Sequence, residues 1–363
     1  MRNITFITSS LNPFKLQYFE NLGRRYKIRI LFTKESDKDC NDNYLNVKSL
    51  YCEINKLKNE KNYDNPICFD LIKKLGDDII IFDGYGPLTN LIGIFYLKIK
   101  RKKFFVFVDG WKRNVREHKL RKLIKYLVFK GDFTFLCSGE TTKENLISYK
   151  VNESRIFIYP MTSISESDII NKPLNFFEKQ KIKEKLGINA TKVVITVGRF
   201  IKSKRIEDLI IAKKNISQDI LLVIIGGKCT PEYESIIKNN GIENIMFVDF
   251  IDSDKLFDYY KCSDVFVMPS ESDVWGLVVN EAMANGLPII VSKNVIAGLE
   301  LIVDNENGFL FDVGDIKSIS KYIQKILCDE NLANKISLNN LKKIRDYTYE
   351  NAAIEIERIL EEN

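Results

Sequence analysis

The chain has 363 residues and a formal net charge of +6, enough for two domains that each bury a core. Hydrophobic residues make up 45% and charged residues 29% of the sequence, which excludes a disordered chain. The seven cysteines lack the close spacing of a zinc or redox motif, and the polar start MRNITFITSS does not resemble a signal peptide. No apolar run reaches the length of a membrane span, so we expect a cytoplasmic protein.

Positive charge is concentrated in one segment. From Lys98 to Lys130 there are thirteen Lys or Arg residues against two acids, Asp109 and Glu117. Such a patch suits nucleic acid, an anionic membrane surface or an acidic substrate. Because no motif of a nucleic-acid-binding domain accompanies it, we expect no nucleic-acid partner.

The first part of the chain alternates short apolar strands with polar, helix-like segments. This pattern predicts a parallel sheet with helices on both faces. The expected strands are ITFITS, YKIRILFT, DDIIIFDGYG, KKFFVFVDGW, FTFLCSG and RIFIYP.

The strand pattern lapses between about 160 and 192 and then begins again. The expected strands of the second half are KVVITVGRF, ILLVIIGGK, NIMFVDFI, VFVMPS and LPIIVS. Two successive doubly wound α/β units therefore follow each other, with ligands expected outside the carboxyl ends of their strands. We assign residues 1–165 to a first domain, 166–340 to a second, and 341–363 to a C-terminal helix that packs back toward the first.

Arg199 and Lys204 follow the first strand of the second half. An Arg fork and a Lys point charge at a strand end can neutralise a diphosphate. The alternative is a solvated basic turn, since Lys202 and Arg205 are also present.

The stretch MPSESDVWGLVVNEAMANGLP, residues 268–288, combines an acidic loop, a helix start and a helix stop. Gly276 lies where a helix begins, and free N–H groups at a helix start bind phosphate. Glu281 lies one turn further on, where a carboxylate can accept hydrogen bonds from sugar hydroxyls. Asp273 precedes the helix and either reaches a sugar ring or only favours the helix start.

These motifs together resemble one family. VGRFIKSKRIEDLI, LLVIIGG, MPSESDVWGLVVNEAMANGLPIIVS and NGFLFDVGD occur in the order seen in the retaining glycosyltransferases of family four, which have the GT-B fold of two Rossmann-like domains facing across a cleft. The resemblance covers about 130 residues of the second half. It implies that Arg199 and Lys204 bind the donor diphosphate, Glu281 holds the ribose, and Asp273 contacts the donor sugar. The backbone of Trp275, Gly276 and Leu277 would cap the phosphates.

The sequence departs from the family at two positions. The family has Glu at both ends of the motif, whereas Asp273 stands at the first end here, which we interpret as tuning donor preference. The family often carries a His after an early strand, whereas the one His of this chain, His118, lies in the basic segment. Asp109 follows the matching strand, and it either assists an acceptor hydroxyl, positions the sugar, or is an ordinary turn aspartate.

Three further expectations concern metal, membrane and acceptor. Asp252-Ser253-Asp254 has the acid-x-acid form of a metal site but precedes a helix, so we expect a cap and no catalytic metal or other cofactor. The basic segment KRNVREHKLRKLIKYLVFK predicts a helix that either packs on its own sheet or contacts the anionic inner face of the plasma membrane. Two strand-end loops would line the acceptor site, through Ser10, Asn12, Gly84 and Tyr85.

We therefore expect a metal-independent, retaining glycosyltransferase that moves a sugar from a nucleotide sugar to a glycan or lipid-linked acceptor in cell-surface polysaccharide synthesis, such as a capsule. One alternative is a nucleotide-sugar epimerase of the same fold, which needs acid–base groups and no acceptor. Another is a non-catalytic binding subunit that kept the fold, for which the Asp at 273 is the favourable feature.

Overall fold

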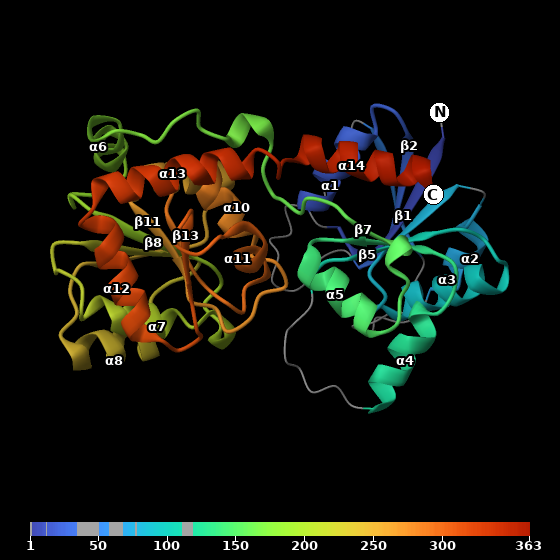
Figure 1. Cartoon of the computed structure of the whole chain (residues 1–363), viewed down its shortest axis with the longest axis horizontal. Coiled ribbons are helices and arrows are strands. Elements are labelled where there is room, and N and C mark those ends of the chain that lie inside the picture. The colour runs from blue at the N-terminus through green and yellow to red at the C-terminus, as the bar shows by residue number, and fades with distance from the viewer. Residues whose placement is uncertain (1, 12, 35–50, 58–67, 77, 111–118) are drawn as a thin grey trace. The chain divides into compact units, whose positions relative to one another are not determined.

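The computed structural model describes residues 2–11, 13–34, 51–57, 68–76, 78–110 and 119–363 (Figure 1). It divides into two compact units. The first comprises Met1–Thr162 together with Tyr349–Asn363, and the second comprises Ser163–Thr348. Each unit is organised around its own parallel sheet.

In the first unit, the described residues form a seven-stranded sheet in the order β3-β2-β1-β4-β5-β6-β7. Every registered strand pair in it is parallel, as expected for apolar strands joined by helices. The strands are β1 (Asn3–Ser10), β2 (Lys27–Lys34), β3 (Cys52–Lys56), β4 (Ile79–Asp83), β5 (Phe105–Val108), β6 (Thr134–Cys137) and β7 (Ile156–Ile158).

Helices cover this sheet, and apolar side chains from β4, β5, β6 and α3 share one buried cluster with α4. The last helix, α14, runs beside α1, coloured red and blue in Figure 1. Tyr18 of α1 meets Tyr349 of α14 edge to face, with ring centroids 5.3 Å apart. The helices are α1 (Pro13–Leu22), α2 (Asp70–Lys74), α3 (Leu88–Ile99), α4 (Lys119–Phe129), α5 (Glu140–Ser148) and α14 (Tyr349–Glu362).

In the second unit, the described residues form a six-stranded parallel sheet in the order β10-β9-β8-β11-β12-β13. The strands are β8 (Val193–Val197), β9 (Leu221–Ile225), β10 (Ile245–Val248), β11 (Val265–Met268), β12 (Ile289–Ser292) and β13 (Gly308–Phe311). The helices are α6 (Phe176–Lys185), α7 (Ile206–Lys213), α8 (Pro231–Asn240), α9 (Ser253–Cys262), α10 (Leu277–Ala284), α11 (Ile296–Leu301), α12 (Ile316–Leu327) and α13 (Glu330–Ile344).

Both sheets reverse their strand order once, between β1 and β4 in the first unit and between β8 and β11 in the second. At such a reversal the connecting helices leave toward opposite faces, and a crevice opens at the carboxyl ends of the two strands. The residues after β1, β4, β8 and β11 are therefore the first places to look for a site.

Four details differ from the sequence-based expectations. β13 (Gly308–Phe311) was not among the expected strands, although its residues lie in the motif NGFLFDVGD. β1 continues through Ser10, so Ser10 ends the strand and does not lie in a loop beyond it. β3 was not expected, because CEINK alternates polar and apolar residues and has no buried run. α9 begins after Asp252 as predicted, but the Asp252 side chain makes no capping hydrogen bond.

Asn12, His118 and the N-terminal part of the basic segment lie outside the described residues.

Candidate donor site in the second unit

Arg199 and Lys204 lie on the connection between β8 and α7. Lys204 ends a single 3-10 turn, Lys202–Lys204, which the left-handed Arg205 (φ 49°) joins to α7. The backbone of Gly226, after β9, packs closely on the start of this connection: a Cβ added at Gly226 would lie only 2.2 Å from the Gly198 carbonyl oxygen. The end of β9 is therefore held directly against the start of the cationic turn.

The loop between β11 and α10 lies at the neighbouring strand end. The backbone N–H of Glu271 donates to the Ser203 carbonyl (2.8 Å), which ties this loop to the turn that carries Lys204. Asn294 Nδ2 donates to the Glu271 carbonyl (2.9 Å), which ties it to the segment after β12. Hydrogen bonds to both neighbouring segments therefore hold the loop between β11 and α10 in place.

Asp273 and Lys204 form an ion pair between these two connections. Both side chains are only partly exposed, at 19% and 18%. Because an incompletely solvated charge pair is screened little by water, each side chain holds the other in place. The structure thus brings together two side chains that the sequence separates by 69 residues.

Gly276 opens α10 in a conformation that other residues rarely adopt, with φ of 102°. A Cβ there would lie 2.8 Å from Val295 Cγ1, so glycine is also required by space. The Trp275 side chain is buried, and its indole N–H donates to Asn280 Oδ1 (2.8 Å). Trp275 can therefore contribute only its backbone to a site, while the first N–H groups of α10 form a turn that attracts anions.

Glu281, in the middle of α10, is held by two hydroxyl groups. Ser163 Oγ donates to Oε1 (2.9 Å) and the Tyr260 hydroxyl donates to Oε2 (3.1 Å). Burial raises the pKa of Glu281 above its usual value, although these hydrogen bonds oppose the rise. Sequence analysis predicted that this carboxylate needs partners but not that Ser163 and Tyr260 supply them.

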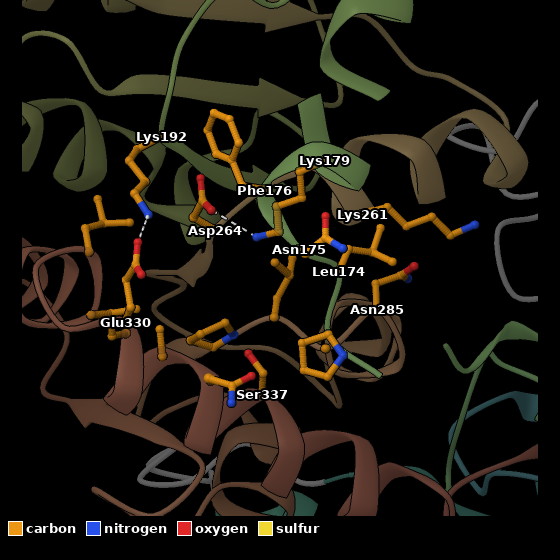
Figure 2. A pocket seen from close by; sticks show the side chains of 18 of the residues that line it. Leu174, Asn175, Phe176, Lys179, Lys192, Lys261, Asp264, Asn285, Glu330 and Ser337 are labelled. Carbon is orange, nitrogen blue, oxygen red and sulfur yellow. Dashed lines mark hydrogen bonds and ion pairs between the residues drawn. The ribbon is translucent and has the colours of Figure 1, made fainter. Parts of the chain in front are cut away.

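The second unit also contains a pocket of about 350 Å³, next to the amino ends of β8, β11 and β12. Figure 2 shows Lys179 beside Asp264 and Lys192 beside Glu330, so each of these cations already faces an acid. Lys179 also donates to the Ser263 carbonyl (2.6 Å), which ties α6 to β11. Because it lies at the other ends of the strands, this pocket is separate from the residues described above.

The residues predicted to bind the acceptor in the first unit also lie at or just after the ends of strands. Asp83 ends β4 and Asp109 follows β5, and both contact Lys15 of α1. Gly84 comes next after Asp83, with φ of 76° and open space around its Cβ position. Tyr85 instead packs against the core, where its ring meets Phe129 edge to face at 4.8 Å. Lys15 was not singled out from the sequence.

The chain thus consists of two parallel α/β units, and the second has cations and a helix start at its strand reversal, an arrangement that suits an anionic ligand. Residues 178–343 match the family model for glycosyl transferases group 1. The capsular polysaccharide biosynthesis glycosyltransferase CapM of Staphylococcus aureus is 27% identical over 329 residues, which cover 80% of this chain and 83% of CapM. An uncharacterized glycosyltransferase of Methanocaldococcus jannaschii is 33% identical over 190 residues, covering 50% of this chain and 48% of that protein.

Solved structures agree on the fold. HepE of Anabaena, solved in complex with UDP, superposes with a TM-score of 0.81 at 16% identity, covering 100% of both chains. The sucrose-phosphate synthase of Thermosynechococcus elongatus superposes with a TM-score of 0.77 at 19% identity, over 100% of this chain and 99% of that one. Residues 178–343, a little under half of the chain, thus match the glycosyl transferases group 1, and the chain has the GT-B fold. The predicted fold is confirmed, and the predicted resemblance to this family is found in the segment that carries the motifs.

Proposed function

We propose that the chain is a retaining, metal-independent transferase that moves a sugar from a nucleoside diphosphate sugar to a hydroxyl of a glycan or lipid-linked acceptor in cell-surface polysaccharide synthesis. The observation that carries the proposal is the Lys204–Asp273 pair beside the first turn of α10. CapM, a capsular polysaccharide glycosyltransferase by name, supports the polysaccharide assignment because the match covers most of both chains.

In the second unit, the donor diphosphate is held by Arg199, Lys204 and the first backbone N–H groups of α10. Glu281 has two carboxylate oxygens with about four acceptor positions, so the hydrogen bonds from Ser163 and Tyr260 leave room for ribose hydroxyls. Asp273, fixed by Lys204, accepts hydrogen bonds from the sugar ring. UDP is the first nucleotide to test, because HepE was solved with UDP and with UDP-glucose.

These donor-side groups suffice to stabilise the leaving diphosphate. The bond between the sugar C1 and the diphosphate oxygen breaks while the acceptor oxygen attacks C1 from the same face. The acceptor proton passes to the departing phosphate oxygen, so the leaving group itself serves as base. Lys204, Arg199 and the helix start neutralise the charge that develops on the diphosphate, which is the work a divalent metal would otherwise do.

The first unit binds the acceptor. We assign Asp109 to the acceptor hydroxyl, as a hydrogen-bond acceptor at the end of β5. Ser10 and Gly84 lie at the ends of the neighbouring strands and would line the same edge, together with Asn12. Tyr85 packs inward against Phe129, so its contribution would be through its backbone.

The α4 face, which we define as Leu123, Ile124, Tyr126 and Leu127, supports contact with an anionic membrane. All four side chains are between 41% and 54% exposed, so the helix does not bury these residues on its own sheet, although Val128 and Phe129 of the same helix are buried there. Lys119, Lys122 and Lys130 are exposed beside them. Apolar side chains ringed by cations suit the surface of an anionic leaflet. In the described residues no helix is long and apolar enough to cross a membrane.

Vesicle binding tests this surface. Cosedimentation with vesicles containing anionic phosphatidylglycerol should retain the wild-type chain at low salt, and Leu123→Glu with Leu127→Glu should abolish retention. The control is Leu338→Glu, an exposed leucine of α13 in the second unit, which should bind like the wild type. Equal binding of all three proteins to neutral and anionic vesicles would overturn the docking proposal.

Product analysis separates the transferase from its rivals. Incubation with UDP-sugars and a soluble glycan acceptor should yield a new glycoside with the anomeric configuration of the donor. Conversion of the donor sugar without any acceptor would indicate the epimerase instead. A non-catalytic subunit would give no product, and Arg199→Ala would then not differ from the wild type in donor hydrolysis.

Ligand stabilisation gives a rapid first screen. A nucleotide at about 100 times its dissociation constant adds about 2.7 kcal/mol to the folding free energy, which thermal unfolding detects. We expect a nucleoside diphosphate to raise the melting temperature and Lys204→Ala to remove that rise. The absence of a rise with every diphosphate tested would contradict the donor assignment.

A further inference from the structure

Lys15, on α1, lies between two carboxylates at the strand reversal of the first unit. Its ammonium group contacts Asp83, which ends β4, and Asp109, which follows β5. The three side chains are between 11% and 17% exposed. The sequence separates Lys15 from these partners by 68 and 94 residues, so only the fold of the sheet brings them together.

Charge at this cluster is unbalanced, with one cation against two acids. Burial alone would lower the pKa of Lys15, but the charges of Asp109 and Asp83 more than offset it and raise that pKa above its usual value. Lys15 is therefore charged at neutral pH. Buried ion pairs are weak stabilisers compared with apolar packing, so an unbalanced one at a ligand-binding edge suggests a purpose other than stability.

Each oxygen of the two carboxylates has a partner. Asp109 accepts from Lys15 on one oxygen and from the Tyr159 hydroxyl on the other. Asp83 accepts from Lys15 on one oxygen and from the Thr8 hydroxyl on the other (2.7 Å). The Tyr159 ring is buried and meets Phe107 edge to face at 4.9 Å, so its hydroxyl is fixed. Asp109 is thus oriented from two directions.

We propose that Lys15 is a positioning residue for the transfer reaction: it holds the Asp109 carboxylate in one orientation, so that the carboxylate can accept a hydrogen bond from the acceptor hydroxyl. This inference rests on the proposed role of Asp109 in acceptor binding. It also restricts the acceptor, because an edge with a surplus of negative charge favours a neutral hydroxyl-bearing sugar over a phosphate group.

The mechanism of positioning is electrostatic. Without Lys15, two carboxylates remain close together with only repulsion between them, which the low local dielectric strengthens. The two side chains then move apart. This removes the oriented carboxylate that would accept the hydrogen bond of the hydroxyl group, while the packing of the surrounding rings is unchanged.

Charge restoration in a double variant provides the test. With a soluble acceptor, Lys15→Met should lower kcat by about 10²-fold, the size expected when a group that aligns the reacting hydroxyl is lost. Lys15→Arg should keep kcat within about tenfold of the wild type, because the cation remains. The double variant Lys15→Met with Asp83→Asn has the original net charge, and we expect it to regain at least about tenfold over Lys15→Met.

Controls separate positioning from folding. Lys213→Met removes another buried lysine, whose ammonium donates to the Ser217 carbonyl (2.8 Å) far along the chain from this cluster. It should lower the melting temperature and leave kcat unchanged. UDP binding by every variant should match the wild type, since the donor residues lie in the second unit.

Two results would overturn the inference, and Asp109→Asn distinguishes its failure from that of the proposed function. Wild-type kcat in Lys15→Met would overturn the inference. A double variant no more active than Lys15→Met would also overturn it, because a packing role predicts that a second substitution adds damage. If Asp109→Asn abolishes transfer while Lys15→Met does not, only this inference fails; if Asp109→Asn is fully active, the proposed role of Asp109 fails with it.

Discussion

Each unit has an ion pair between lysine and aspartate at the carboxyl ends of its strands. The charge left over around the pair is positive in the second unit and negative in the first. In the second unit, Lys204 pairs with the single carboxylate of Asp273. Arg199 lies on the same connection as Lys204, and the start of α10 follows the loop that carries Asp273. In the first unit, Lys15 is shared by Asp83 and Asp109. Both pairs lie at the reversal of strand order, so the fold supplies the same position twice.

The difference teaches how one architecture can bind two unlike groups. An edge with excess positive charge and free backbone N–H groups suits a diphosphate. An edge with excess carboxylate suits hydroxyl groups, which donate hydrogen bonds to it. We infer that the division of labour between donor and acceptor follows from local charge and not from any difference in sheet topology.

The strongest way to break this comparison is to remove the donor-side cation. Lys204→Ala should lower kcat/KM by about 10²–10³-fold, because the charge that develops on the leaving diphosphate loses a preorganised partner. Steady-state kinetics with saturating acceptor measures it. Lys202→Ala, two residues earlier on the same turn and exposed, is the matched control and should remain near wild type. Equal losses in both variants would mean that only general positive charge matters.

A second prediction compares the two glycines at the edges. Gly276→Ala should destabilise the protein by about 1–3 kcal/mol, because its φ of 102° is strained for alanine and the new Cβ would meet Val295. Gly84→Ala shares the positive φ but has open space around its Cβ position, so we expect a smaller loss. Chemical denaturation measures both. A larger loss at Gly84 would show that the α10 start is less tightly packed than described.

The smallest predicted effect concerns Glu281. Glu281→Gln should weaken UDP binding by about tenfold, because a charged hydrogen-bond acceptor becomes neutral. Isothermal titration calorimetry at neutral pH measures this change. Unaltered affinity would remove Glu281 from the ribose site.

The same variant has a predicted pH signature. The pKa of Glu281 is raised in the folded protein, so the folded state binds more protons than the unfolded state just above the ordinary value of 4.5. Wild-type stability should therefore fall, relative to Glu281→Gln, as pH rises from 4.5 toward neutral. Melting temperatures of the two proteins should converge at acid pH. A difference that grew on acidification would mean that the carboxylate is stabilised as the anion.

Much of the second unit could be predicted from sequence because its signals are local. The β8 turn with Arg199 and Lys204 and the segment from Asp273 to Glu281 are each continuous in the chain. Short apolar strands also predicted the two doubly wound sheets. The segment that matches the family model, residues 178–343, contains these motifs.

What could not be predicted depends on contacts between distant residues. Ser163 reaches Glu281 across 118 residues, and Lys15 reaches Asp83 across 68, with no local pattern to mark either pair. β3 was missed because CEINK follows no apolar run, and its place beside β2 comes from pairing along the sheet. Local pattern therefore indicated the proposed donor residues but neither their partners nor the Lys15 cluster.

A crystal structure of the full chain with UDP tests the central claim most directly. We predict diphosphate oxygens within hydrogen-bonding distance of Arg199, Lys204 and the first N–H groups of α10, with the ribose hydroxyls on Glu281. A diphosphate bound instead in the pocket around Lys179 and Asp264, with the edge beside Gly276 empty, would contradict the account.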